Sequence, residues 1–166
     1  TTLFRSAIKA VTIIGLRQTY DVIQSIGISG LRDPSFYGVS LALGAVEVRL
    51  EDLANAYRLL ANGGEWSPLV FSEDERSRSV KNNSKDGTVV ERPLSRQVFS
   101  LQTSFLVGSI LSDANARSIG FSWNSPLETA FWSAVKTGTS KDMRDNWCLG
   151  WTSQFTVGVW VGNFNG

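Results

Sequence analysis

The residue types best suited to chemistry follow one another at Lys136, Thr137, Gly138, Thr139 and Ser140. Alternate side chains of an extended strand share a face, so Lys136 and Gly138 are predicted to point one way and Thr137 and Thr139 the other. A cation and hydroxyl groups would then flank a glycine that lets another backbone approach closely. An extended peptide could pair with such a strand and place its carboxylate among the Lys and Thr groups.

The alternative is a polar strand end that runs into a turn, and for an isolated Lys-Thr-Gly the two interpretations carry about equal weight. The number of matches expected by chance distinguishes the two interpretations. In a chain of this composition Lys-Thr-Gly is expected roughly 0.03 times, and about 0.0003 times when Thr-Ser must follow. The five-residue pattern therefore indicates a functional strand.

Three segments rich in β-branched and aromatic residues, 132–135, 146–151 and 155–161, must position this pattern. Short polar turns separate them, which predicts three successive antiparallel strands. Both faces of the last segment are largely apolar, so we expect it to be a central strand with helices on both sides. The predicted fold class is α+β, an antiparallel sheet with helices on both faces.

Helical periodicity and stop signals predict the remaining elements. A helix is expected over 19–26, ending at Gly27, and the strongest one over 50–60. Ser95 is a candidate N-cap for a helix that runs to about Leu111, and Asp113 and Arg117 could pair if that helix continues. The other expected segments are an ordered loop over 31–44, a strand over 66–71, a polar hairpin or loop over 72–87, and a short strand over 88–91.

Composition excludes several classes of protein. The 166 residues include 16 Lys plus Arg, 15 Asp plus Glu and 42% hydrophobic side chains, which suits one globular domain and gives no footprint for nucleic acid or an anionic membrane. Cys148 is the one cysteine and histidine is absent, so an intramolecular disulfide and a Ser-His-Asp triad are excluded. We expect no metal and no cofactor. Apolar runs of about seven residues are far shorter than the ~20 that span a bilayer.

Lys-Thr-Gly, together with S-x-x-K and S-D-N, marks penicillin-binding proteins and class A β-lactamases. The resemblance to class A penicillin-binding proteins, bifunctional peptidoglycan synthases, continues outside the motif, and several segments resemble the 1C subtype in particular. It rests on Leu41 to Gly44, Asp52 to Tyr57, Leu60 to Gly64, Ile110 to Asp113, Ala134 to Ser140, Arg144 to Trp147 and Thr156 to Asn163. The resemblance covers about 7–166 and implies the C-terminal part of a transpeptidase domain with a partial serine β-lactamase-like fold.

This resemblance implies a D,D-transpeptidase that cross-links peptidoglycan stem peptides through an acyl-serine intermediate and binds penicillin. Lys136 would be catalytic, placed among the polar partners of the nucleophile, and the backbone N–H of Thr139 would donate to the oxyanion. Thr137, Gly138 and Thr139 would bind the substrate, the two hydroxyls contacting its carboxylate. The partners implied are a peptidoglycan stem peptide and β-lactam antibiotics.

The serine nucleophile is expected to be missing. Ser6 to Lys9 and Ser133 to Lys136 read S-x-x-K, and Ser122 to Asn124 reads S-x-N, but chance predicts matches of about this number. In the family both motifs precede the helix that corresponds to 50–60, and the nucleophile begins a buried helix. The chain is therefore expected to be inactive alone, as a fragment of an active serine-type D-Ala-D-Ala transpeptidase.

The ends of the resemblance carry two further expectations. Thr1 to Ser6 match the translated end of a DNA-sequencing adapter, so 1–6 are expected to be a non-native leader, although Leu3, Phe4 and Arg5 could instead begin a helix. Family members of this kind also carry an N-terminal membrane anchor and a glycosyltransferase domain, which places the parent protein at the periplasmic face of the bacterial inner membrane. Contact with the membrane would be made only through that missing anchor.

Other chemistry-bearing residues have simpler explanations. Four tryptophans, Trp132, Trp147, Trp151 and Trp160, could line a groove but more often pack a core. Cys148 is expected to be a buried small hydrophobe, since no histidine is present to activate it. Arg144 and Asp145 could border a substrate groove, and a hairpin salt bridge is the simpler interpretation.

Two classes of function remain open. The first is the enzyme fragment, and the second is a non-catalytic module that binds peptidoglycan peptides on the same sheet. A serine β-lactamase is a weaker alternative, because the long match before the Lys-Thr-Gly motif resembles synthases. The fragment interpretation predicts poor stability, with an exposed sheet face and strand edge.

Overall fold

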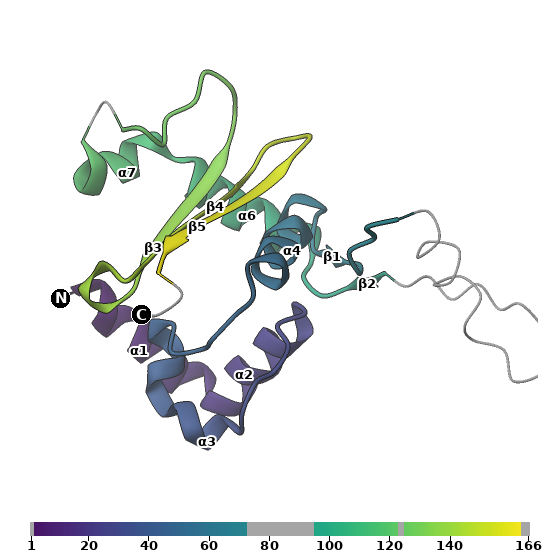
Figure 1. Ribbon diagram of the computed structural model, residues 1–166, viewed down its shortest axis with the longest axis vertical. Coiled ribbons are helices and arrows are strands. Elements are labelled where there is room, and N and C mark those ends of the chain that lie inside the picture. The colour runs from purple at the N-terminus through teal and green to yellow at the C-terminus, as the bar shows by residue number, and fades with distance from the viewer. Residues whose placement is uncertain (1, 73–94, 123–124, 164–166) are drawn as a thin grey trace, which may run out of the picture.

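The computed structural model describes residues 2–72, 95–122 and 125–163 (Figure 1). The chain begins with two helices, α1 (Thr2–Ile14) and α2 (Leu16–Ser25). Gly15 separates them with a φ of 102°, a conformation that glycine adopts without a steric penalty. The predicted helix over 19–26 is confirmed as α2, which begins three residues earlier and is followed by Gly27, also at positive φ.

The segment predicted as a loop over 31–44 is helical instead, and that prediction is wrong. It contains α3 (Pro34–Tyr37) and the 3-10 helix η1 (Gly38–Leu43). Asp33 caps α3 by accepting hydrogen bonds from the backbone N–H and hydroxyl of Ser35, which lower the pKa of its carboxyl. Pro34 follows the cap, where its missing N–H costs nothing. Tyr20, Tyr37 and Leu41 form the buried core beneath these turns.

The strongest predicted helix, 50–60, is confirmed as α4 (Leu50–Ala61). The strand predicted after it is only partly present, because β1 is Glu65–Trp66 and pairs with β2 (Arg96–Gln97). The segment that follows β1 is instead bound to α4 through Asn55 and Arg58. The Arg58 guanidinium donates to the carbonyl oxygens of Ser67 at 2.6 Å and of Pro68 at 3.2 Å, which satisfies backbone groups that a strand partner would otherwise satisfy. It also donates to the Asn55 side chain at 2.9 Å.

Helix α6 (Leu101–Ser112) begins later than predicted, and Ser100 rather than Ser95 is its N-cap. The Ser100 hydroxyl oxygen accepts the backbone N–H of Thr103 at 3.1 Å. Asp113 ends this helix and caps the next, α7 (Ala114–Phe121). The possible pair with Arg117 is not formed, because Arg117 donates to the backbone carbonyls of Leu111 and Leu127.

The three predicted antiparallel strands are confirmed as β3 (Ala134–Thr139), β4 (Asp145–Trp151) and β5 (Thr156–Gly162), with the short 3-10 turn η2 (Lys141–Met143) between the first two. Their order is β3, β4, β5. The fold class is therefore the expected α+β, a mixture of helices and antiparallel sheet. However, the last strand lies at an edge of this sheet rather than at its centre.

Helices α4 and α6 pack on the same face of the sheet. Gly158 makes this possible, since a Cβ there would lie 3.1 Å from Leu50 and 3.3 Å from Ala54. On the opposite face of β5 the valines at 157, 159 and 161 remain exposed. Within the described ranges, then, the expected helices on both sides of this strand are not seen.

Two sequence predictions fall outside this description. Of the polar hairpin or loop over 72–87 only Ser72 belongs to the described residues, and the strand over 88–91 lies wholly outside them. Among the helices that are described, none combines the length and the hydropathy needed to cross a bilayer.

Candidate active site

Strand β3 holds the Lys-Thr-Gly-Thr pattern in the extended conformation that its proposed chemistry needs. Its register with β4 pairs Lys136 with Leu149 and Thr137 with Cys148. Lys136 and Gly138 therefore share one face and Thr137 and Thr139 the other, as the sequence predicts. β3 is also an edge strand of the described sheet, which leaves one side available for an extended peptide.

Lys136 presents an exposed ammonium group beside this edge. Its Nζ donates to the carbonyl oxygen of Thr137 at 2.5 Å, and it forms no ion pair with any carboxylate in the described part of the chain. The carbonyl oxygen carries no net charge, so this hydrogen bond does not neutralise the positive charge of the ammonium group. The side chain is therefore available to attract an anionic group of a ligand.

The other residues of the pattern differ in exposure. Thr137 is half-buried, whereas Gly138 and Thr139 are exposed. Among the described residues, a Cβ at Gly138 would meet only Trp147, at 3.6 Å, so packing within the strand does not require glycine here. The open space above Gly138 is what a ligand backbone would need in order to approach β3 closely.

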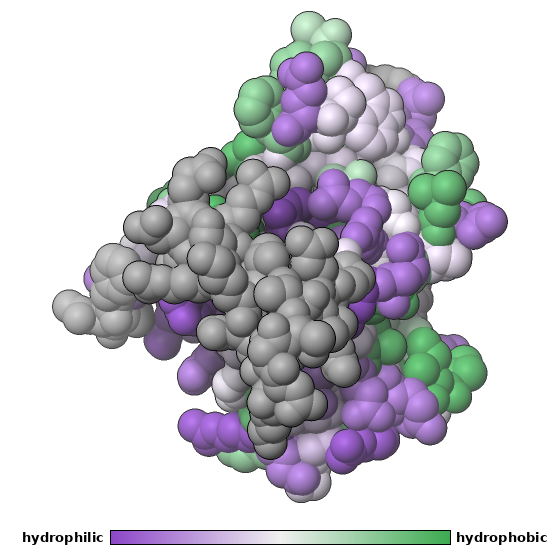
Figure 2. All heavy atoms as spheres, turned by 90° about the vertical axis from the view of Figure 1, so that its right-hand side faces the viewer, coloured by the Kyte–Doolittle hydropathy of each residue, from purple (hydrophilic) through white to green (hydrophobic). Residues whose placement is uncertain are grey.

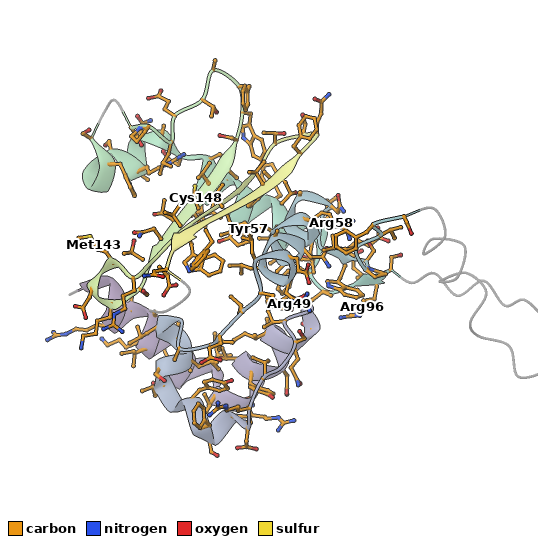
Figure 3. All side chains as sticks on the ribbon, viewed as in Figure 1. Arg49, Tyr57, Arg58, Arg96, Met143 and Cys148 are labelled. Atoms are coloured by element: carbon orange, nitrogen blue, oxygen red, sulfur yellow. The ribbon has the colours of Figure 1, made fainter. Side chains whose placement is uncertain are left out.

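The hairpin after β3 is closed by hydrogen bonds between Ser140 and Asp145. Each backbone N–H of the pair is satisfied at 2.9 Å, by the Asp145 carbonyl and by the Ser140 hydroxyl. The Asp145 carboxylate accepts the indole N–H of Trp160 at 3.0 Å. The salt bridge expected between Asp145 and Arg144 is not formed. Asp142 and Met143 both adopt positive φ in the turn, with Met143 at its tip (Figure 3).

The candidate nucleophiles of the sequence are not brought to Lys136. Ser133 lies just before β3, and its hydroxyl is 2.8 Å from the Thr129 hydroxyl. Ser6 and Lys9 lie on α1, which packs against η1 and α2 rather than against β3. Ser122 ends α7, and its motif partners at 123 and 124 lie outside the described residues.

The tryptophans divide between core and surface. Trp151 is buried, 5.9 Å from Tyr57 and 6.5 Å from Trp132 between ring centroids. Trp132 is more than half exposed and precedes β3 rather than lying in it. Trp147 and Trp160 pack against each other at 6.3 Å. Core packing therefore accounts for Trp151, while Trp132 keeps a surface that a ligand could reach.

Cys148 is half-buried in the middle of β4, on the face away from α4, so it is less buried than expected. Tyr57 lies on α4 (Figure 3), and burial, followed by the proximity of Cys148, raises the pKa of its phenol. The raised pKa keeps the phenol of Tyr57 protonated near neutral pH.

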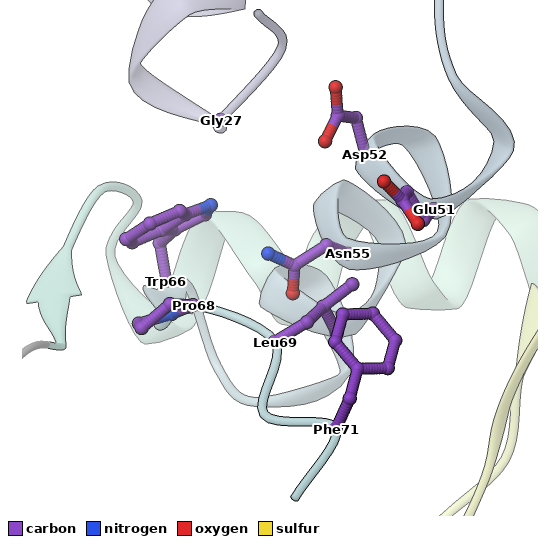
Figure 4. A pocket seen from close by; sticks show the side chains of 8 residues that line it. All are labelled: Gly27, Glu51, Asp52, Asn55, Trp66, Pro68, Leu69 and Phe71. Atoms are coloured by element: carbon purple, nitrogen blue, oxygen red, sulfur yellow. The ribbon is translucent and has the colours of Figure 1, made fainter. Parts of the chain in front are cut away.

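A hollow that sequence reasoning missed lies at the start of α4 (Figure 4). Glu51, Asp52 and Asn55 meet Trp66 and the segment 68–71 around a cavity of about 220 Å³. Asp52 accepts a hydrogen bond from Ser29, and Asn55 donates to Ser67 and accepts from Arg58. The Asp52 and Asn55 side chains therefore have partners within the fold, whereas the buried indole N–H of Trp66 has none among the described residues. The hollow lies apart from β3.

Comparison with known proteins gives consistent relatives. Penicillin-binding protein 1A of Rickettsia bellii is 27% identical over 173 residues, covering 93% of this chain and 21% of the relative. Penicillin-binding protein 1C of Escherichia coli is 30% identical over 77% of the chain and 14% of the relative. Penicillin-binding protein 4 of Bacillus subtilis is 27% identical over 94% of the chain and 24% of the relative. No family model matches the chain.

The homologues of this chain are thus bacterial penicillin-binding proteins, and the fold is consistent with part of a penicillin-binding transpeptidase domain. They include proteins named 1A, 1B, 1C and 4, so the comparison does not single out the 1C subtype expected from the sequence. The chain spans about a fifth of the length of the relatives that it matches over most of its own length.

Proposed function

We propose that this chain is the C-terminal part of the transpeptidase domain of a class A penicillin-binding protein, with β3 as the strand that borders the active site. The observation that carries the proposal is the geometry of β3. It is an edge strand with two threonines on one face and, on the other, a Lys136 ammonium that forms no ion pair within the described residues. Similarity to penicillin-binding proteins over 93% of the chain supports it.

In the complete protein, β3 would hold the stem peptide or a β-lactam by strand addition. The hydroxyls of Thr137 and Thr139 would bind the terminal carboxylate, and Gly138 would leave room for the peptide backbone. Lys136 would supply positive charge beside the acyl-forming serine, and the Thr139 N–H would stabilise the oxyanion of the tetrahedral intermediate. The serine would come from a part of the protein that precedes α4, so the chain alone would be inactive.

Several finer features belong to the same proposal. The 1C subtype is supported by Arg144 to Trp147 and by the strand Thr156 to Asn163, which resemble it. The parent would be a bifunctional synthase with a glycosyltransferase domain and an anchor, located at the periplasmic face of the inner membrane. Residues 1–6 would be a leader that is not native to it.

A binding module without catalysis is the second candidate. It is favoured by the positions of Ser6 and Ser133, neither of which pairs with Lys136. Such a module would hold a stem peptide on the edge of β3 with no covalent step. Labelled penicillin separates the two candidates, because only an acyl-serine survives denaturation.

The test labels the complete product of the gene with fluorescent penicillin and compares Lys136→Met with the wild type. The proposal predicts a covalent label on the wild type and acylation at least roughly 100-fold slower in the variant, the size of an acid-base or charge contribution. Lys141→Met, in the turn after the strand, is the matched control and should keep the label. A wild type that stays unlabelled, or a Lys136→Met variant that labels normally, would refute the catalytic proposal.

A further inference from the structure

Several large apolar side chains of helix α6 are exposed to solvent. Leu101, Phe105, Leu106 and Ile110 are each at least 60% exposed. Figure 2 shows that hydrophobic side chains reach the surface at several places on the face that it presents. An apolar helix surface of this kind marks a site of interaction when it borders a cavity with defined walls.

Such a cavity lies between α6, the end of α4 and two tryptophans. Its volume is about 360 Å³, and Trp132 and Trp151 line it together with Phe105 and Gly108. The two indole rings meet edge to face at 69°, and Tyr57 continues the row beyond Trp151 at 70°. Both tryptophan rings lie against α6 at Gly108, where a Cβ would be in ordinary contact with Trp151 at 3.5 Å and with Trp132 at 4.0 Å.

One buried hydroxyl group, that of a serine, lines the cavity. Ser104 lines it, is 3% exposed, and its Oγ has no hydrogen-bond partner in the described part of the chain. Serine in a helix can satisfy its hydroxyl on the carbonyl one turn earlier, so an unsatisfied one needs an explanation. A hydrogen-bonding group of a bound molecule would remove this cost.

The chemistry of the walls defines the occupant. Among the described residues no charged side chain lines the cavity, which disfavours an ionised ligand, since a charge taken from water would find no partner there. Aromatic edges and faces favour a flat ring, and the volume suits one small molecule. We propose that the cavity binds a neutral aromatic compound of one or two rings that carries one hydroxyl or N–H group, which pairs with Ser104. This site is distinct from the β3 edge and does not rest on the function proposed for that edge.

Phenol, benzene and benzoate are the probes, titrated into the ¹⁵N-labelled chain of 166 residues while the amide signals of residues 104 and 108 and the indole signals of Trp132 and Trp151 are followed. Phenol should shift these signals saturably. Benzene should bind about tenfold more weakly, the ratio expected for one hydrogen bond, and benzoate should not bind. In Ser104→Ala phenol and benzene should bind equally.

Gly108→Leu should fill the cavity and abolish phenol binding, and Gly120→Leu, at a helical glycine with open space around it, is the matched control. If Gly108→Leu fails to fold, the loss of the preference for phenol in Ser104→Ala still decides. Shifts that never saturate, a preference for phenol that survives in Ser104→Ala, or equal binding of benzoate would overturn the proposal. So would shifts at these residues that follow protein concentration without phenol, which would make a second copy of the chain the occupant.

Discussion

Lys136 illustrates how residue type and geometry combine at the residue scale. Its place beside a strand edge could be predicted, since the alternation of a strand fixes which residues share a face. Its hydrogen bond to the Thr137 carbonyl could not, because that contact depends on the rotamer of a long flexible side chain. The same holds for Asp145, whose adjacent arginine suggested a salt bridge although its partner, Trp160, is fifteen residues away.

Tyr57 gives a prediction at this scale. Its pKa is raised, first by burial and then by Cys148, so the folded protein holds this proton more tightly than the unfolded chain does. The stability linked to the proton is complete below about pH 10, the unfolded value, and is lost as the pH rises through the higher folded value. Tyr57→Phe should therefore lose less stability between pH 9 and 11 than the wild type, as measured by urea unfolding. A wild type and variant with identical pH profiles would show that the phenol does not titrate differently on folding.

At the scale of elements, hydrophobic periodicity predicts which helices and strands exist better than it predicts where they begin and end. The helix at α4 and the three strands of the sheet were predicted because their apolar residues repeat with the right period. The turns of α3 and η1 were missed, since a four-residue helix is too short to show a period and is set by Asp33 and Pro34. β5 has two apolar faces, which suggested a central strand, but the described sheet provides a neighbour only on one side.

Substitutions at Ser100 and Ser95 distinguish two candidate N-caps for α6. Ser100→Ala should lower the free energy of unfolding by ~1 kcal/mol, because the N–H of Thr103 loses its acceptor. Ser95→Ala is the matched control and should change it by less than ~0.5 kcal/mol, since Ser95 lies outside the helix. Denaturant unfolding monitored by far-UV circular dichroism measures both. Equal losses in the two variants would mean that the helix begins earlier than Ser100.

At the scale of the whole molecule, apolar surface exceeds what this fold covers. Leu149 and Trp151 are buried beneath α4 and α6, while Val157, Val159 and Val161 lie exposed on the other face. The prediction of an exposed sheet face agrees with this arrangement. A sequence alone cannot show which of two apolar faces a helix will choose. Here Gly158 decides it by admitting α4 to close contact with β5.

Val159→Thr should reduce self-association of the chain, measured by light scattering against concentration, and leave the free energy of unfolding within ~0.5 kcal/mol of the wild type. Leu149→Thr, on the covered face, should instead lower the free energy of unfolding by roughly 2–4 kcal/mol through lost burial and an unsatisfied hydroxyl.

The wild type should unfold at low temperature with weak cooperativity. A sharp transition at high temperature, in a chain that stays monomeric, would contradict the idea of an incomplete domain.

The central claim, that β3 is the third motif strand of a transpeptidase whose nucleophile lies upstream, is tested most directly by long-read sequencing of the gene before codon 7. The account predicts an open frame that encodes S-x-x-K and then S-x-N ahead of α4, preceded by a glycosyltransferase domain and an anchor. It also predicts that codons 1–6 are absent from the genome. A native start codon near Thr1, with authentic coding sequence through Ser6, would contradict the claim and leave peptide binding without catalysis as the function of β3.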